Sequence, residues 1–293
     1  RRMTAPSMTV LATGPLTTVQ DAGRPGRAAQ GIGSSGACDR ASYRLANRLV
    51  GNAETAATVE FTFGGLDVRL RNPATVAFTG AYCPGGPGWR LALTLPAGYR
   101  LTLQPPATGL RSYLAVRGGV AIEPVLGSRA TDLLSGLGPP VLQPGMLLPV
   151  GTEVAGEPCG EAAADPDVAA GEVTVEVLPG PRTDWFTDPR RLFGRAWTVQ
   201  PDSNRIGIRL AGEPVQRSRA GELPPEPMLP GAIQVPPDGL PIVLFRDAPV
   251  TGGYPVIGVL PERELDRVAQ LRPGDTLRLV PGIGWKAGSA AAG

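Results

Sequence analysis

The stretch from Thr17 to Asp39, TTVQDAGRPGRAAQGIGSSGACD, gathers polar side chains among glycines. Glycine lets the backbone adopt positive φ and approach a ligand closely. Amide, carboxylate, hydroxyl and guanidinium groups can then converge on a small polar molecule, and an arginine can bind a carboxylate through two parallel hydrogen bonds. The polar members are Gln20, Asp21, Arg24, Ser34, Ser35 and Asp39. A pair of surface turns with the usual turn residues is the alternative interpretation.

A second polar group lies in the other half of the chain. It consists of Gln234, Asp238-Gly239, Asp247 and the run TGGYP at 251–255, which supplies a hydroxyl, two glycines and a phenol. The chain has no histidine, so proton transfer would fall to a carboxylate, to Tyr254 or to a bound water. A Gly-rich turn with a tyrosine packed on proline explains TGGYP equally well.

The missing residue types exclude several kinds of chemistry. Without histidine there is no His-based triad, metal ligand or proton shuttle, and the only lysine is Lys286. A P-loop lysine, a Schiff-base lysine and a biotin-carrying lysine are therefore not expected. Cys38, Cys83 and Cys159 are scattered and show no CxxC spacing, so we predict no metal site and a reduced, cytoplasmic protein.

Charge and hydropathy exclude two classes of partner. The net charge is only +2 and aromatic residues make up 5%, so neither a nucleic-acid surface nor a stacking platform is expected. No apolar run has the length of a signal peptide or a membrane span, so no membrane partner is expected. The motif GxxxxGK[ST] is also missing, and any ATP should bind mainly on a partner chain.

The pattern of apolar residues predicts a mainly β protein with a few short helices. Forty glycines and 33 prolines punctuate short Val, Leu and Ile runs, which is typical of many short strands and turns. One helix should begin at Asp39 as N-cap and end before Gly51, so capping explains Asp39 as well as function does; a second should cover 261–270. The clearest strands are predicted at Met8–Ala12, Thr17–Gln20, Thr58–Phe63, Leu66–Leu70, Thr75–Phe78, Leu91–Leu95, Arg100–Gln104, Ser112–Val116 and Val173–Leu178.

Short echoes indicate an internal duplication. Thr18-Val19-Gln20 is repeated at 198–200, Gly65-Leu66 at 239–240, and the strand entry at 95–103 is repeated at 271–279, all in the same order. We therefore predict two similar β-rich barrel domains, 1–168 and 169–293, with 151–170 as a linker or exposed excursion. A ligand would be expected where the two domains meet.

Long runs of the chain resemble one known family. They include TTVQDAGRPG, SSGACDRASYRLANRLVGN, VEFTFGGLDVRL, LGSRATDLLSGLG, SNRIGIRLAG and GAIQVPPDGLPIVLFRDAPVTGGYPVIGVL. Over nearly its whole length the chain is similar to the C subunit of bacterial 5-oxoprolinase. The same family is also called allophanate hydrolase subunit 2, the Kip-type antagonist and the biotin-dependent carboxyltransferase family.

The resemblance implies a fold, partners and site residues. The fold would be two cyclophilin-like β-barrel domains. The partners would be a B subunit, of the allophanate hydrolase subunit 1 or Kip-inhibitor type, and an A subunit, and the complex would use ATP to open 5-oxoproline to glutamate. Matching the family motif residue by residue implies catalytic roles for Asp21, Arg24, Asp247 and Tyr254. It implies substrate-binding roles for Gln20, Ser35, Asp39, Asn47, Gln234, Asp238, Thr251 and Gly253.

Three functions remain open at this point. The first is an amide-ring-opening subunit of 5-oxoprolinase, active only in the complex. The second is a carboxyltransferase component of the urea or allophanate type, which would need biotin on a separate carrier. The third is a non-enzymatic regulator that binds a Kip-inhibitor-like B subunit. None of the three functions involves a nucleic acid or a membrane.

Overall fold

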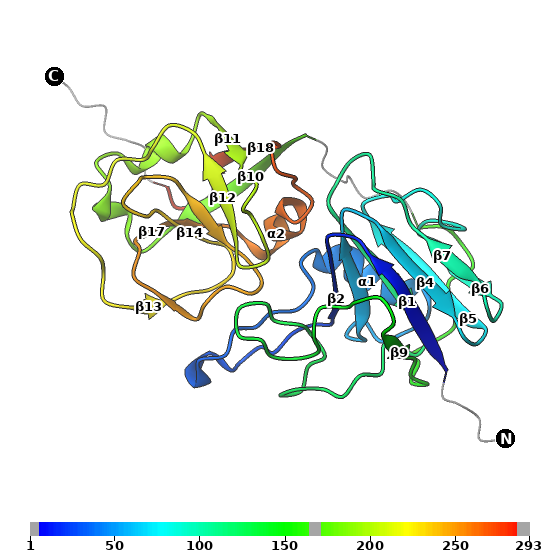
Figure 1. Ribbon diagram of the computed structural model, residues 1–293. Coiled ribbons are helices and arrows are strands. Elements are labelled where there is room, and N and C mark those ends of the chain that lie inside the picture. Colours follow the sequence, from blue (N-terminus) through cyan, green and yellow to red (C-terminus); the bar gives the residue numbers. More distant parts are fainter. Residues whose placement is uncertain (1–5, 164–170, 286–293) are drawn as a thin grey trace. The chain divides into compact units, whose positions relative to one another are not determined.

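The computed structural model describes residues 6–163 and 171–285. The chain divides into two compact units, Arg1–Ala169 and Ala170–Gly293, and each is considered by itself (Figure 1). Strands dominate both units, so the predicted mainly β architecture is confirmed. The predicted boundary between residues 168 and 169 lies outside the described residues and stays a prediction.

Two antiparallel sheets build the N-terminal unit. Its strands are β1 Ser7–Thr13, β2 Leu16–Gln20, β3 Thr58–Thr62, β4 Leu66–Leu70, β5 Ala74–Gly80, β6 Leu93–Leu95, β7 Arg100–Thr102, β8 Arg111–Val116 and β9 Leu147–Pro149. One sheet has the order β7-β4-β1-β9 and the other the order β2-β3-β8-β5-β6. The apolar faces of the two sheets share one core, and helix α1, Arg40–Leu49, covers the outer face of the five-stranded sheet.

Strand β8 illustrates why this sheet is buried on both sides. Leu114 and Val116 belong to the core between the sheets, whereas Tyr113 and Ala115 pack against α1. Successive side chains of a strand point to opposite faces, so a continuous apolar run is what a doubly covered strand requires. The backbone N–H of Ser42 donates to Asp39 Oδ1 at 2.9 Å, which confirms Asp39 as the N-cap of α1.

The C-terminal unit is a closed barrel. Its barrel strands are β10 Glu172–Pro179, β11 Ala196–Val199, β12 Gly207–Ala211, β14 Ala232–Gln234, β15 Ile242–Leu244, β17 Val256–Val259 and β18 Thr276–Pro281. They follow the order β10-β17-β14-β15-β12-β11-β18, and a parallel pairing of β10 with β18 closes the ring. In β10 the buried residues Val173, Val175 and Val177 alternate with exposed ones, as expected for a barrel wall.

Smaller elements complete the C-terminal unit. Helix α2, Glu262–Val268, lies within the predicted helix at 261–270 and buries Leu265 and Val268. A two-stranded ladder pairs β13, Glu226–Pro227, with β16, Thr251–Gly252. The short 3-10 turns of the chain are η1 Ala28–Gln30 in the N-terminal unit, with η2 Thr183–Trp185 and η3 Pro189–Leu192 in the C-terminal unit.

The strand orders support the predicted duplication in part. The run β2-β3-β8-β5 of the N-terminal unit is matched by β11-β12-β15-β14, and each run takes four strands in the chain order first, second, fourth, third. The echo at 18–20 and 198–200 therefore begins on equivalent strands, β2 and β11. The predicted equivalence of Gly65-Leu66 with 239–240 is wrong. Leu66 begins β4, which pairs with β1 and β7, whereas 239–240 precede β15, which pairs with β12 and β14.

The two units also differ in closure. In the N-terminal unit the described strands pair as two sheets, and only the C-terminal unit forms a hydrogen-bonded ring. The edge strands β6, β7 and β9 are three residues each. Pro96 directly follows β6 and Pro149 ends β9; because proline has no N–H to donate, it limits these ladders.

The predicted linker is partly fastened to the N-terminal unit. Several of its backbone N–H groups donate back to this unit, among them Gly151 to Gly119 O (2.9 Å), Ala155 to Gly51 O (2.9 Å) and Cys159 to Leu49 O (2.8 Å). Prolines and glycines prevent a regular strand here, but the amides still find acceptors. Residues 151–163 are therefore an exposed strap on this unit, and 164–170 lie outside the described residues.

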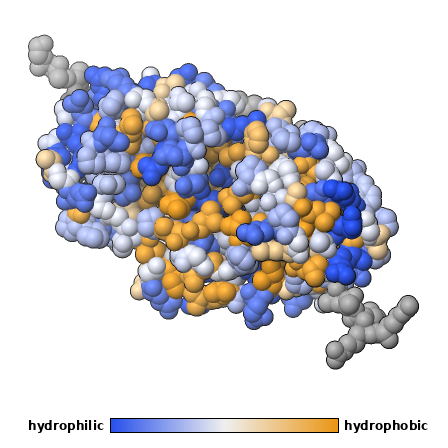
Figure 2. Space-filling view, viewed as in Figure 1, coloured by the Kyte–Doolittle hydropathy of each residue, from blue (hydrophilic) through white to orange (hydrophobic). Residues whose placement is uncertain are grey.

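Charged and apolar side chains are mixed on the surface. On the face in Figure 2, apolar side chains gather over the loops of the N-terminal unit. Val125, Leu126 and Leu134, all in the loops after β8, are 36%, 40% and 49% exposed. No helix in the described ranges is long and apolar enough to cross a membrane.

Candidate functional site

Asp21 joins two loops of the N-terminal unit. Its Oδ1 accepts hydrogen bonds from Gly23 N (2.8 Å) and Ser128 Oγ (2.6 Å), and its Oδ2 accepts one from Arg129 N (2.5 Å). The carboxylate is 7% exposed. A carboxylate is suited to this role because it accepts several donors at once. The contacts make Asp21 the clamp that fixes the loop at 125–131 against the loop that follows β2.

Arg24 and Ser35 strengthen the same clamp. The Arg24 guanidinium donates from Nε to Val125 O (3.0 Å) and from Nη2 to Ala130 O (2.6 Å). Ser35, at φ 50, donates from Oγ to Thr131 O (3.2 Å). Both side chains are buried and face backbone carbonyls. In this geometry they position the loop at 125–131.

Gln20 ends β2 beside this loop and carries an unpaired acceptor. Its Nε2 donates to Thr131 O at 2.9 Å and to Thr18 Oγ1 at 3.1 Å. Within the described part of the chain, neither Gln20 Oε1 nor Thr131 Oγ1 has a hydrogen-bond partner, although both residues are buried. An unsatisfied buried polar atom costs about 1–3 kcal/mol, and a water or a substrate N–H would remove that cost at Gln20 Oε1.

Asp39 and Asn47 lie at α1, apart from the clamp. The Asp39 carboxylate accepts from Ser42 N and from Ser42 Oγ (2.7 Å), which is ordinary capping. Asn47 Nδ2 donates to Ala56 O (2.8 Å) and its Oδ1 accepts from Asn52 Nδ2 (3.1 Å). The Asn47 contacts close the turn between α1 and β3. Asp39 and Asn47 therefore hold the start and the end of the helix in place.

A buried carboxylate next to α1 was not among the predicted site residues. Glu60 Oε2 accepts hydrogen bonds from Tyr113 Oη (2.7 Å) and Cys38 N (2.8 Å), and Tyr113 Oη accepts one from Asp39 N (2.8 Å). Burial, followed by the charge of Glu60, raises the pKa of Tyr113 well above its usual value. The phenol therefore stays protonated and links the loop before α1 to the sheet.

In the C-terminal unit, Gln234 and the TGGYP run lie together. Gln234 Nε2 donates to Tyr254 O at 3.2 Å. A Cβ on Gly252 would lie 2.7 Å from that nitrogen, so a larger residue at 252 would displace the Gln234 amide. Gly253 O accepts from Leu223 N at 2.9 Å, and Thr251 is exposed at the start of β16.

Tyr254 and Asp238 line a polar pocket of about 290 Å³. Tyr254 is half-buried and Asp238 is exposed, its Oδ1 accepting from Leu240 N at 3.0 Å. Arg209, which pairs with Asp202 at 3.0 Å, contributes a cation to the same pocket. Asp202 lines the pocket as well, and the other lining residues are Gln200, Leu210, Pro236, Leu240, Pro241 and Ile242.

Asp247 is held in a separate network. Its two oxygens accept from Arg205 Nη2 and Nε, both at 2.9 Å, and the side chains are 0% and 1% exposed. This bidentate pair is buried and geometrically ideal. The structure therefore places Asp247 as the partner of Arg205 and away from the pocket that Asp238 and Tyr254 line.

The structure thus sorts the predicted residues into groups. Gln20, Asp21, Arg24 and Ser35 meet at the loop 125–131 in one unit. In the other unit, the pocket-lining pair Asp238 and Tyr254 is linked to Gln234, Thr251 and Gly253 through the TGGYP run. Asp39 and Asn47 stay at α1, and Asp247 stays with Arg205. In the described ranges, no group of three or more His, Cys, Asp and Glu could hold a metal ion.

Sequence reasoning missed several participants. Ser128, Arg129 and Thr131 belong to the run GSRATD, which carries the resemblance but offers no local signal of contact with residues about 100 positions away. Arg209 lines the pocket from β12, and Gln200 lines it from the turn that follows β11. For Gln200 a signal existed, since it is the echo of Gln20 in the second half.

Comparisons with known proteins agree in family. The family model described as carboxyltransferase domain, subdomain A and B, matches residues 30–281. The chain is 39% identical to the 5-oxoprolinase C subunit of Escherichia coli over 92% of this chain and 90% of that protein. It is 29% identical to the protein of the same name in Haemophilus influenzae, over 89% and 86%.

Longer proteins contain the same domain pair. Urea amidolyase of Lachancea kluyveri is 32% identical over 93% of this chain, which spans only 17% of that protein. The crystal structure of K. lactis urea amidolyase matches with a TM-score of 0.88 and 28% identity, over 95% of this chain and 19% of the other. The structure of TTHA0988 matches with a TM-score of 0.85 and 32% identity, over 94% and 55%. The chain therefore belongs to the carboxyltransferase domain family, subdomain A and B.

Proposed function

We propose that this chain is the C subunit of an ATP-dependent 5-oxoprolinase. One observation carries the proposal: the match to the 5-oxoprolinase C subunit of E. coli covers about nine-tenths of both chains, at 39% identity. The urea amidolyase matches reach similar coverage of this chain but less than a fifth of those longer proteins. The higher identity to the E. coli subunit, 39% against 32% for urea amidolyase, favours the oxoprolinase C subunit.

The proposed reaction opens a cyclic amide. Water adds to the lactam carbonyl of 5-oxoproline, the C–N bond breaks, the nitrogen takes up protons, and glutamate forms; hydrolysis of ATP to ADP and phosphate consumes a second water and drives the opening. We place ATP mainly on the A or B subunit, because this chain has no Walker-type phosphate motif. We also place the complex in the cytoplasm, where both ATP and reduced thiols are available.

Within this chain we assign substrate contacts to the polar pocket of the C-terminal unit. Arg209 can bind the carboxylate of 5-oxoproline, and Tyr254 and Asp238 can hydrogen-bond the lactam N–H and C=O or exchange protons with them. Gln234 and Thr251 hold the TGGYP run, and Gly253 keeps it close to the neighbouring loop. Asp21, Arg24 and Ser35 position the loop 125–131 and Asp247 fixes Arg205, so these four act through other residues.

The proposal is tested by mixing purified chains. Glutamate formation from 5-oxoproline and ATP is measured with this chain, the A subunit and the B subunit, with and without avidin. We expect glutamate and ADP to form together, insensitive to avidin. A stable three-chain complex that forms no glutamate would overturn the proposal.

A second candidate is a carboxyltransferase component. It is favoured by the family description and by the TM-score of 0.88 with urea amidolyase. In that case the complex would need bicarbonate and a biotin carrier, would carboxylate urea or a related amide, and would be blocked by avidin. Biotin is a cofactor under this alternative alone.

A further inference from the structure

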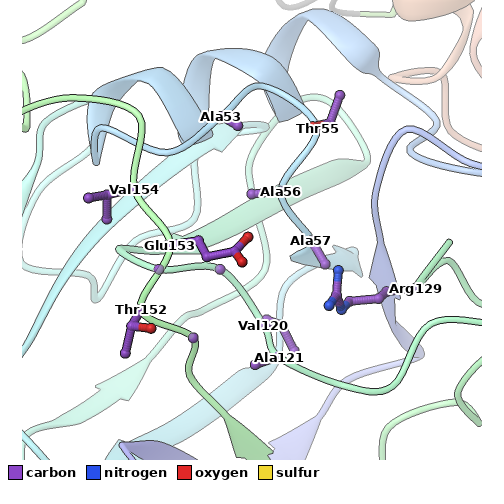
Figure 3. A pocket seen from close by; sticks show the side chains of 13 residues that line it. Ala53, Thr55, Ala56, Ala57, Val120, Ala121, Arg129, Thr152, Glu153 and Val154 are labelled. Atoms are coloured by element: carbon purple, nitrogen blue, oxygen red, sulfur yellow. The ribbon is translucent and has the colours of Figure 1, made fainter. Parts of the chain in front are cut away.

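A pocket of the N-terminal unit is lined by one residue of the loop 125–131, Arg129, and by none of the predicted site residues. It measures about 450 Å³ and opens between the α1–β3 connection, the Gly118-Gly119 turn after β8, and the strap at 151–154 (Figure 3). Its walls are small: Ala53, Ala56, Ala57 and Ala121 line it. A volume in this range suits a small organic ligand.

The floor of this pocket is built tightly. Gly118 has φ 93, and a Cβ there would lie 1.9 Å from Gly151 O. Gly151 N donates to Gly119 O at 2.9 Å, and Gly118 N donates to Asn52 Oδ1 at 2.8 Å. The turn and the strap therefore form one fixed surface, which holds the shape of the pocket.

Two oppositely charged side chains line this pocket and form no ion pair with each other within the described ranges. Arg129 and Glu153 are the charged residues that line it, and Figure 3 shows their charged groups pointing toward the same space. Arg129 is oriented because its Nε donates to Ile122 O at 2.5 Å. Among the described residues, its two terminal nitrogens and the Glu153 carboxylate have no hydrogen-bond or ion-pair partner.

A ligand with a carboxylate and an ammonium group would satisfy both charges. The Arg129 guanidinium can bind a carboxylate through parallel N–H groups, and the Glu153 carboxylate can accept from an ammonium. A small α-amino acid carries these two groups on one carbon atom. We propose that the pocket binds an amino acid, with its carboxylate at Arg129 and its ammonium at Glu153.

A ligand bound in this pocket would also affect the contact between Asp21 and the loop 125–131, because Arg129 belongs to both. The backbone N–H of the same residue donates to Asp21 Oδ2, so a ligand that holds the guanidinium also holds the loop 125–131. The ligand class follows from the two charges alone. The choice of L-glutamate as a probe rests on the proposed function, in which glutamate is the product.

The test is direct binding to the full chain by calorimetry, with L-glutamate, L-alanine and N-acetyl-L-alanine. N-acetyl-L-alanine is the matched negative probe, because it keeps the carboxylate of L-alanine while its nitrogen is an uncharged amide. We expect saturable binding of at least one amino acid and at least about tenfold weaker binding of N-acetyl-L-alanine, as expected when a charge-assisted hydrogen bond is lost.

Variants assign the binding to this pocket. Glu153 is exposed and has no partner among the described residues, so Glu153→Gln should fold normally and weaken amino-acid binding at least about tenfold. Arg129→Gln should weaken it similarly while keeping the backbone bond to Asp21. Glu161→Gln on the same strap and Arg71→Gln on the same unit are the matched controls and should bind as the parent does.

Three results would overturn the inference: no saturable binding of either amino acid, N-acetyl-L-alanine bound as tightly as L-alanine, or unchanged binding by Glu153→Gln. None of them depends on catalysis. A complex that forms no glutamate, combined with charge-dependent amino-acid binding by this chain, would reject the proposed function and keep the amino-acid site.

Discussion

The carboxylate of Asp21 accepts a hydrogen bond from the backbone N–H of Arg129 at 2.5 Å, across 108 positions of the chain. This bond joins the loop after β2 to the loop 125–131, and the side chains of Arg24 and Ser35 bind the same loop. The most polar stretch of the N-terminal half is thus a clamp on a distant loop. Its function depends on what that loop contacts.

Replacing Asp21 tests the clamp. Asp21→Asn keeps the shape but turns one acceptor oxygen into an NH₂ group that faces a donor, so the free energy of unfolding should fall by about 1–3 kcal/mol. Ser128→Ala, which removes one of the three donors, should cost less, about 1 kcal/mol. Urea denaturation of both variants measures this, and an Asp21→Asn variant as stable as the parent would show that the clamp is not needed for folding.

The buried pair in the barrel gives a larger effect. Asp247→Leu leaves the Arg205 charge buried without its carboxylate, and breaking a buried pair in this way costs about 3–5 kcal/mol. The double variant Arg205→Met, Asp247→Leu removes both charges and should recover most of the loss. Thermal unfolding compares the two; a single variant that melts with the parent would mean that the carboxylate is dispensable for stability.

Acid should loosen the ladder that holds TGGYP. Glu226 lies on β13, which pairs with β16. Hydrogen bonds from the Arg182 side chain, followed by its charge, lower the pKa of Glu226. A lowered folded-state pKa stabilises the ladder above the ordinary glutamate pKa of about 4.3, and this contribution is lost as pH falls through the folded value. The protection factor of Gly252 against hydrogen exchange should therefore fall below about pH 4 in the parent.

The control for this pH effect is Glu226→Gln. This variant lacks the titrating group, so its protection factor at Gly252 should be lower near neutral pH and should change little on acidification. An identical acid response in parent and variant would assign the effect to other carboxylates.

Leu126 is an exposed leucine in a strained conformation. Its φ is 55, which costs a leucine roughly 1–2 kcal/mol, and it is 40% exposed beside Val125, whose carbonyl accepts from Arg24. Strain of this kind persists where a function needs it. We expect Leu126→Asn to unfold at equal or higher denaturant concentration but to bind the B subunit more weakly, as measured by size-exclusion chromatography.

Leu229→Asn, in an exposed apolar position of the other unit, is the matched control and should leave binding unchanged. Full binding by Leu126→Asn would mean that this loop is not part of the surface that binds the B subunit.

Much of the fold could be predicted from sequence because its signals are local. Alternation in Val173–Leu178, the cap at Asp39 and glycine-punctuated strands each depend on near neighbours, and the structure confirms them. The sheet pairing could not be predicted, because register depends on distant partners: Leu66 and Leu240 look alike in sequence but lie in or next to strands with different neighbours.

The sequence marked side chains that could do chemistry but did not show what each of them contacts. Residue type marked Asp21, Arg24 and Asp247 as chemically able, but a carboxylate that binds a substrate and one that binds a backbone amide or an arginine look the same in sequence. Only the contacts separate Tyr254, which lines a pocket, from Asp247, which is paired at 2.9 Å. Arg129 has no local signal at all.

Glutamate release from 5-oxoproline and ATP in single-omission mixtures tests the proposed function most directly. The three chains are combined, then each is left out in turn, and Tyr254→Phe replaces the parent in a final mixture with its complex formation checked on a sizing column. We predict glutamate only when all three chains are present, and a large loss with Tyr254→Phe in an intact complex. Undiminished glutamate release without this chain would contradict the proposal.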